Sequence, residues 1–367
     1  MTLKLKLLAC VLLAVQPVCA QDVRIGVLGL FRPRRIALGT EAGQALIIHT
    51  RTVQGTEKSF TLERSSGPAT AEISVYGDGL MLRIGDQSLR ISELHASSRR
   101  NGAADFTLAI REKISRRYRG VLEIKAVAGI LLPVVRMDLE TAVASVIQAE
   151  SAPDTPLEAL QAQAVATRSY LVAARGRHRD FDFCDTTHCQ FLREPPPPES
   201  IASHAAVATR GLVLAYQRHT VAAMFTRSCG GRTRTPQEVG LSSQGYPYFS
   251  AVCEYCLRHP SHWVRHLAQA DAAGINLREP TEASRLDIDR RLGWDAVPSN
   301  DFMARRDAKG VILEGTGQGH GIGLCQSGAK AMAQSGATFR EILEHYYPNT
   351  TLLNTHLAAD LSDAMVR

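Results

Sequence analysis

The spacing of apolar residues changes near Asp138, and this change constrains the fold more than any other feature. Before it, segments such as 71–76 and 80–84 alternate apolar and polar residues, which is the period of a half-buried β-strand. After it, apolar residues recur at the spacing of one helix face, at Leu139, Val143, Val146 and Ile147. The pattern predicts an α+β protein, in which a β-rich N-terminal region (21–136) precedes a mixed α/β region (137–367).

Two consecutive helices are expected at the start of the second region. The first covers 138–150, and a break at 151–154 separates it from a second helix that runs to about residue 174. Thr155 is a suitable N-cap, and Glu158 three residues later would complete a capping box. The two helices would form a hairpin. Later in the chain, strands are expected at 212–216 and 220–226, and a last helix is expected to begin at Thr338 with Glu341 in its first turn.

The N-terminus has the pattern of a secretory signal peptide. A basic start is followed by the apolar run 7–15 and by small residues at 18–20, so we expect residues 1–20 to be removed after Ala20. A lipoprotein signal at Cys10 fits less well, because Cys10 interrupts the apolar run. No later run is long enough for a membrane span. We therefore expect an exported protein, in the periplasm or at the cell wall.

Composition excludes several classes of protein. Hydrophobic residues make up 45% and charged residues 21% of the 367 residues, which is typical of a globular protein with a true core. The net charge of +6 is small and scattered, so nucleic acid is not an expected partner. A mild positive charge is compatible with an anionic polymer, although an ordinary solvated surface is the simpler explanation.

Glu150 is the first candidate for chemistry. On a helix it shares a face with Val143, Val146 and Ile147. A carboxyl group that ends an apolar stripe is partly desolvated, which favours the neutral, proton-donating form that a general acid needs. On this pattern alone, however, a helix-end glutamate that points into water is the simpler interpretation.

A group of four residues has the composition of a zinc site. The four are His178, Cys184, His188 and Cys189, called the His/Cys cluster below. Two thiolates and two imidazoles suit a closed tetrahedral site, in which zinc is structural and no cofactor is needed for chemistry. A disulfide between Cys184 and Cys189, or two free thiols, are the alternatives.

Four further cysteines follow in the chain, and they are enough for two disulfides: Cys229, Cys253, Cys256 and Cys325. Disulfides are the favoured interpretation in an exported protein, although their pairing does not follow from the sequence. Cys253 and Cys256 with His259 and His262 form a weaker metal pattern.

Five alternating glycines lie between 315 and 323. They fit neither a dinucleotide-binding loop nor a P-loop. Such a segment allows the backbone to approach a ligand closely, with His320 and Gln326 as polar groups, or it forms a tight structural turn.

Six segments, in this order, resemble the stage II sporulation protein D family: 138–150, 156–170, 185–190, 228–233, 319–329 and 345–348. The likeness covers about residues 120–350. It implies a peptidoglycan lytic transglycosylase, which cuts glycan strands between N-acetylmuramic acid and N-acetylglucosamine and leaves a 1,6-anhydro end. The family's catalytic glutamate falls on Glu150. The alternative that the family offers is an amidase enhancer, which binds glycan and assists a cell-wall amidase without cutting.

The resemblance also implies positions for the rest of the site. Some family members carry zinc in the segment that holds the His/Cys cluster. The candidate substrate contacts are Arg168, Ser169, Tyr170, Gln190, His320 and Gln326. Gly240 stands where the family often has a tryptophan, so a stacking platform for sugar is expected to be missing unless Trp263 replaces it.

Overall fold

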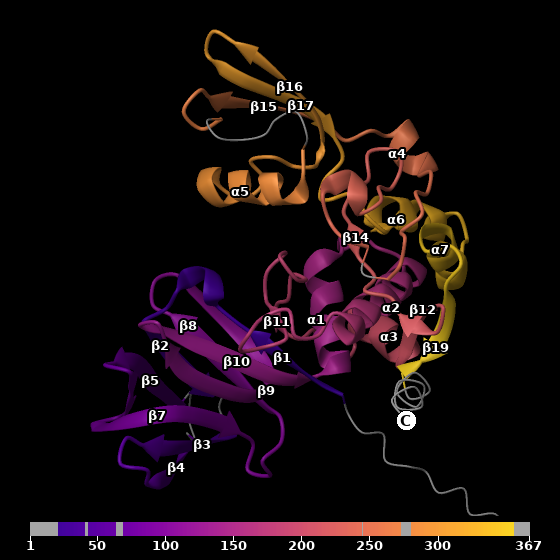
Figure 1. Cartoon of the computed structure of the whole chain (residues 1–367). Helices are drawn as coiled ribbons and strands as arrows, with labels where there is room; N and C mark the ends of the chain where they lie inside the picture. The colour runs from indigo at the N-terminus through magenta and orange to yellow at the C-terminus, as the bar shows by residue number, and fades with distance from the viewer. Residues whose placement is uncertain (1–20, 41–42, 64–68, 244, 273–279, 356–367) are drawn as a thin grey trace, which may run out of the picture.

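The computed structural model describes residues 21–40, 43–63, 69–243, 245–272 and 280–355 (Figure 1). The predicted signal peptide, residues 1–20, lies outside the described residues. The fold is α+β, as predicted, with β-strands first and helices after them. Within the described residues, no helix is long and apolar enough to cross a membrane.

The N-terminal region is built from consecutive antiparallel strands. Their bounds are β1 Asp22–Gly26, β2 Arg35–Thr40, β3 Ala45–Thr52, β4 Glu57–Glu63, β5 Ala69–Tyr76, β6 Gly79–Ile84, β7 Gln87–Ser97, β8 Ala104–Ile110, β9 Ile114–Val127 and β10 Ile130–Asp138. The order in the sheet is β11-β1-β10-β9-β8-β2-β5-β6-β7-β3-β4, where β11 is the short strand Phe183–Cys184, and β7 also pairs with β9. The strands from β9 through β8, β2, β5 and β6 to β7 therefore close on themselves around a core that includes Leu38, Ile73 and Leu108.

The predicted helical hairpin follows directly. Helix α1 (Leu139–Glu150) begins after Asp138, whose side chain accepts a hydrogen bond from the Thr141 N–H. Its apolar face packs into the same core as the strands. Helix α2 (Leu157–Ala173) is almost entirely buried, and in Figure 1 both helices lie between the strands and the C-terminal elements.

The capping box predicted at the start of α2 is not formed. Pro156 occupies the N-cap position, and Thr155 instead donates its hydroxyl to the carbonyl oxygen of Ala152. Glu158 accepts a hydrogen bond from the N–H of Phe339, the first residue of helix α7 (Phe339–Tyr346). A contact between distant segments therefore replaces the local cap.

The rest of the chain surrounds α2 with short elements: β11 Phe183–Cys184, α3 Ile201–Ala208, β12 Leu212–Tyr216, β13 His219–Thr220, β14 Phe225–Thr226, α4 Glu254–Arg258, β18 Leu324–Cys325, α6 Gln326–Gln334, α7 Phe339–Tyr346 and β19 Thr351–Asn354. Most of them form a second core with the other face of α2, whereas β11 and α3 pack into the first core. The strand predicted over 220–226 is split between β13 and β14. Helix α7 has the expected capping box between Thr338 and Glu341.

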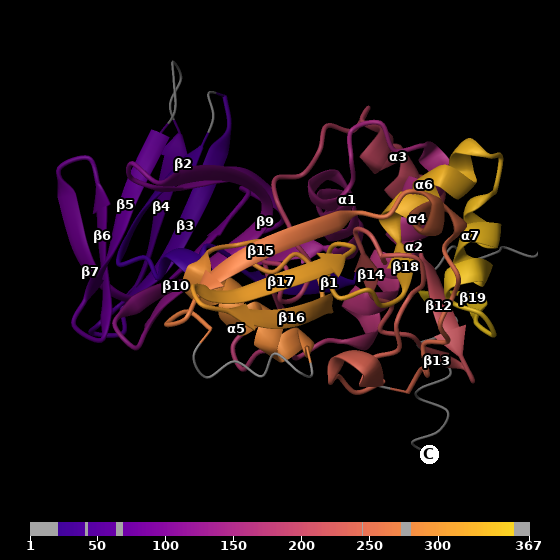
Figure 2. The same ribbon diagram turned by 90° about the horizontal axis from the view of Figure 1, so that it is seen from above.

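A third unit with its own small core interrupts this region. It consists of β15 (His262–Ala268), α5 (Glu282–Leu292), β16 (Asp301–Asp307) and β17 (Gly310–Thr316). In Figures 1 and 2 its three strands lie together on the side of the molecule near α4, away from β3 and β4. Trp263 belongs to this core: it is 8% exposed and donates its indole N–H to Ser299. Its ring is therefore not free to stack on a sugar, and the suggested replacement for the missing tryptophan is wrong.

Candidate active site

Glu150 lies at the wall of a cavity of about 380 Å³, at the point where α1 ends. The cavity lies between the α1–α2 hairpin and the segments around Arg227, α4 and α6. Its lining is formed by Glu150, Ser151, Ala152, Thr155, Ala159, Gln163, Arg227, Tyr255, Leu324, Gln326, Ser327, Ala329, Lys330, Ala331 and Gln334. Among these residues, Glu150 is the only one with a carboxyl group.

Burial sets the protonation state of Glu150. Desolvation raises the pKa of its carboxyl group from 4.5 to about 7. Two neighbours oppose this shift to a smaller extent: the N–H of Phe191, which donates to Glu150 Oε1 over 2.8 Å, and the positive charge of Arg227. The group is therefore held in place by a backbone donor and stays protonated to near-neutral pH.

A hydrogen-bond network fixes the end of α1. Gln326 Nε2 donates to the backbone oxygen of Glu150 over 3.1 Å and to Gln163 Oε1 over 3.2 Å. Ser151 Oγ donates to the same oxygen of Gln163 over 2.9 Å. The structure thus brings together Glu150 and one of the six predicted contact residues, Gln326.

Arg168 is not a substrate contact. It is fully buried in α2, where its guanidinium binds both carboxylate oxygens of Glu140 at 2.6 and 2.8 Å. It also donates to the carbonyl oxygens of Leu212 and Ala206. With these partners Arg168 joins α1, α3 and β12, so the prediction for this residue is corrected to a structural role.

The two residues that follow Arg168 are also interior. Ser169 is fully buried, and its hydroxyl donates to the Val165 carbonyl and accepts from the Leu214 N–H. Tyr170 is 4% exposed, with its ring 5.7 Å from that of Phe183. Neither lines the cavity, so both predicted contacts are corrected.

Gln190 and His320 have different surroundings. Gln190 is 7% exposed and directly precedes Phe191, whose N–H binds Glu150. Gln190 is therefore next in the chain to a residue that binds Glu150, but it is not itself one of the residues that line the cavity. His320 lines a separate small pocket with Ser299 and Asp301, and its Nδ1 accepts the N–H of Ile322. The structure therefore does not bring His320 to Glu150.

The His/Cys cluster converges on one point. The four ligand atoms all lie within 4.8 Å of one another. Cys189 Sγ lies 3.3 Å from His178 Nε2, 3.5 Å from Cys184 Sγ and 3.6 Å from His188 Nδ1. The corners of a tetrahedron around zinc are about 3.4–3.8 Å apart when Zn–N and Zn–S are about 2.1 and 2.3 Å. The residues present fit a zinc ion.

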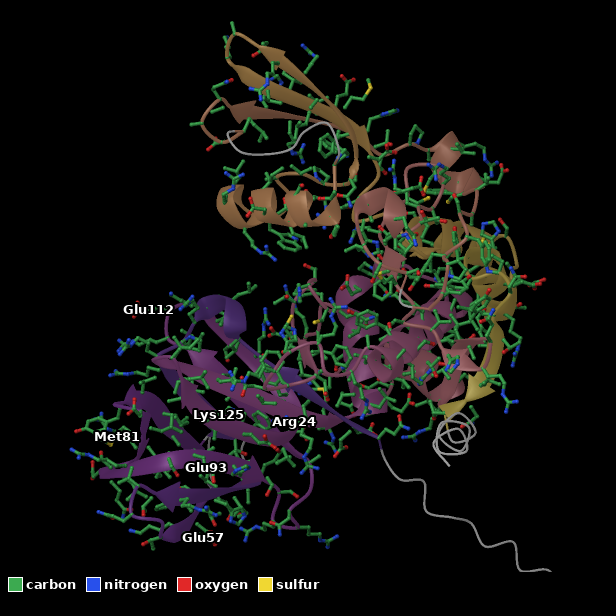
Figure 3. All side chains as sticks on the ribbon, in the orientation of Figure 1. Arg24, Glu57, Met81, Glu93, Glu112 and Lys125 are labelled. Carbon is green, nitrogen blue, oxygen red and sulfur yellow. The ribbon has the colours of Figure 1, made fainter. Side chains whose placement is uncertain are left out.

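Three aspartates hold the loop of the His/Cys cluster against the N-terminal region through hydrogen bonds and ion pairs. Asp185 is 2% exposed, and its Oδ2 accepts from the Leu28 N–H and from Arg116 at 3.0 Å. Arg24 and Lys125, both labelled in Figure 3, hold the start of the loop. The Arg24 N–H donates to Asp182 over 2.9 Å, and Lys125 pairs with Asp180 at 2.6 Å. The cluster and the N–H of Phe191 therefore belong to one anchored segment.

None of the six cysteines of the described chain forms a disulfide. In particular Cys256 Sγ and Cys325 Sγ lie 3.6 Å apart, well beyond the bond length of about 2.05 Å in a disulfide. The two disulfides expected among the last four cysteines are absent from the structure.

Sequence reasoning did not single out several cavity residues. Gln163 lies within the segment that resembles the family, and Arg227 directly precedes the motif that begins at Ser228. Proximity to motifs was the available signal for both. The sequence carries no such signal for Tyr255 and Lys330, because their positions at the cavity depend on how α4 and α6 pack.

Comparison with known proteins finds relatives of the region that contains the α1–α2 hairpin. Residues 128–216, which include α1 and α2, match the model of the family described as Stage II sporulation protein. An uncharacterized protein of Brachyspira hyodysenteriae is 26% identical, with 81% of this chain and 83% of that protein covered.

Two relatives from Bacillus have names that point to a role. The amidase enhancer of Bacillus subtilis is 25% identical over 56% of this chain and 39% of its own length. Stage II sporulation protein D of Bacillus amyloliquefaciens is 25% identical over 58% of this chain and 74% of its own length. Over residues 128–216 the chain is therefore similar to the stage II sporulation protein D family.

Proposed function

We propose that this protein is an exported peptidoglycan lytic transglycosylase in which Glu150 is the general acid and then the general base. The observation that carries the proposal is the position of one desolvated carboxyl group, with a pKa of about 7, in a cavity lined by no other carboxyl group. Ordinary glycosidases need a pair of carboxylates. A lytic transglycosylase needs one, because the sugar provides its own nucleophile.

The chemistry uses each form of Glu150 in turn. The protonated carboxyl group donates its proton to the glycosidic oxygen as the bond from that oxygen to C1 of N-acetylmuramic acid breaks. The carboxylate then accepts the proton of the C6 hydroxyl as its oxygen bonds to C1. The products are a free hydroxyl end and a 1,6-anhydro end, no water is consumed, and Glu150 is protonated again.

The cavity has two cationic groups for an anionic glycan. Arg227 is exposed at its edge, and Lys330, which pairs with Asp154, lies on the same wall. Peptidoglycan carries carboxylates on its lactyl and peptide groups, so these cations would orient a strand across Glu150. Gln163, whose Nε2 is buried without a partner among the described residues, provides a further donor near the cavity.

We also propose that the His/Cys cluster binds structural zinc. Four protein ligands leave no open position, so the ion would brace the loop that presents the Phe191 N–H to Glu150. Zinc content by atomic emission should fall by one equivalent when Cys184 and Cys189 are both changed to Ser. An unchanged zinc content would contradict this assignment.

The second candidate is a glycan-binding amidase enhancer without activity of its own, which is favoured by the name of one relative. The test measures two quantities for the purified protein, for Glu150→Gln and for the matched control Glu344→Gln, an exposed carboxyl group on α7. These are the release of soluble fragments from peptidoglycan and co-sedimentation with it. We expect release by the wild type and the control only, with sedimentation unchanged. Sedimentation without release by any of the three would favour the enhancer.

A further inference from the structure

Four cysteines that lie far apart in the sequence converge in the second core. They are Cys229, Cys253, Cys256 and Cys325, called the tetracysteine cluster here. Their four Sγ atoms all lie within 4.8 Å of one another, and Cys256 Sγ and Cys325 Sγ are 3.6 Å apart. All four side chains are at most 3% exposed. We propose that the tetracysteine cluster binds a single structural zinc ion, distinct from the one in the His/Cys cluster.

The spacing of the sulfur atoms fits one ion. A tetrahedral site with Zn–S bonds of about 2.3 Å has sulfur atoms about 3.8 Å apart. An iron–sulfur cluster places several metal and sulfide ions between its thiolates, which then lie further apart. A tetrahedral set of four sulfur ligands around one metal is the preference of zinc among the common divalent ions.

Donors around the sulfur atoms favour thiolates. The Gly328 N–H points to Cys325 Sγ over 3.5 Å, and the Tyr346 hydroxyl points to Cys253 Sγ over the same distance. Ser228 Oγ lies 3.5 Å from Cys256 Sγ. Hydrogen bonds from such outer groups stabilise the negative charge of metal-bound thiolates, whereas a neutral disulfide has little need for them.

The backbone makes room for this arrangement. A Cβ atom at Gly328 would lie 2.6 Å from Cys253 Sγ, so only glycine fits beside the cluster. Gly230 and Gly231 follow Cys229 with φ of 75° and 127°, values that favour glycine. The turn that they make lets the Gly231 carbonyl accept the N–H of Cys253, which fixes two ligand segments to each other.

The tetracysteine cluster lies directly behind the cavity. Arg227, Tyr255 and Gln326 line the cavity, and each is within two residues of a cluster cysteine. The ion would therefore tie together the three segments that form the wall opposite α1. With four protein ligands it has no open position, so it stabilises this wall and takes no part in chemistry. The inference does not depend on the proposed reaction, because it concerns metal content.

The experiment measures zinc per chain in the purified protein and in two double variants. Cys253→Ser with Cys256→Ser removes two ligands of the tetracysteine cluster, and Cys184→Ser with Cys189→Ser is the matched control in the His/Cys cluster. We expect the first variant to lose one equivalent of zinc relative to the wild type. We expect the control to keep the metal of the tetracysteine cluster.

Cobalt substitution keeps the test independent of how well the first variant folds. The control variant, with all four cluster cysteines intact, should show intense thiolate-to-cobalt charge-transfer bands at one cobalt per chain. Absence of these bands would overturn the proposal. Two disulfides among the four cysteines, detected as four cysteines that are not alkylated in denatured, unreduced protein, would also overturn it.

Discussion

Gln326 Nε2 donates a hydrogen bond to the backbone oxygen of Glu150 across 176 positions of sequence. This bond connects the last residue of α1 to the first residue of α6. The same amide also binds Gln163, so the three residues hold the end of α1 in one position relative to the cavity.

Gln326→Ala should lower turnover by about 10- to 100-fold, because small displacements of a catalytic group have large effects on rate. KM should change less than kcat. The check is the initial rate of fragment release at several peptidoglycan concentrations, with Gln237→Ala, an exposed glutamine outside the cavity lining, as the control. Equal losses of rate in both variants would contradict a specific positioning role for Gln326.

Arg227→Gln should extend activity to higher pH. The positive charge of Arg227 favours the carboxylate form of Glu150 and so lowers its pKa. Without it, Glu150 stays protonated to higher pH and the alkaline limb of the pH–rate profile moves up. Lys330→Gln, which removes the other cation of the cavity, should leave the limb in place. A downward shift for Arg227→Gln would contradict the assignment of the limb to Glu150.

Glu150→Gln should stabilise the protein at alkaline pH. The pKa of Glu150 is raised in the folded state, from 4.5 to about 7. The contribution of Glu150 to the free energy of unfolding is therefore most favourable below pH 4.5 and is lost as the pH rises through 7. Glutamine is neutral throughout. The variant should therefore gain about 1–3 kcal/mol in free energy of unfolding, relative to wild type, between pH 5 and pH 8. Urea unfolding at both pH values measures this difference, and a pH-independent difference would argue against a buried titrating carboxyl group.

Arg168→Met should destabilise the fold by about 3–5 kcal/mol, because it leaves the carboxylate of Glu140 without its buried partner. Adding Glu140→Met should recover part of the loss. The exposed pair Arg111–Glu112 provides the control, since Arg111→Met should have almost no effect on the free energy of unfolding. A small loss for Arg168→Met in urea unfolding would contradict a structural role for this ion pair.

The elements with a clear period were predictable from sequence. The strands at 71–76 and 80–84 and the helix ending at Glu150 lie where the alternation and the helical spacing placed them. Each of these elements packs one face into the core, so its sequence carries the pattern of that face.

Caps and ion pairs depended on distant partners. The same capping-box pattern occurs at Thr155 and at Thr338, yet only the second forms, because Glu158 binds the N–H of Phe339. Arg168 lies in a motif segment, but the motif alone does not determine whether the Arg168 side chain contacts a ligand or Glu140. Only the packing of α1 against α2 decides this.

The convergence of the four late cysteines could not be predicted either. Cys253 and Cys256 are close in sequence, but Cys229 and Cys325 come from other segments. Because export favours disulfides, disulfides were the expected outcome. The convergence of all four sulfur atoms on one point depends on how β14, α4 and α6 pack together.

If Glu150 drives cleavage without water, no oxygen from the solvent enters the products. Peptidoglycan is digested in H₂¹⁸O by the wild-type protein and by Glu150→Gln, and the fragments are weighed by mass spectrometry. We predict anhydro fragments free of ¹⁸O from the wild type and none from the variant. Fragments that carry ¹⁸O at the new end, or anhydro fragments from Glu150→Gln, would contradict the claim.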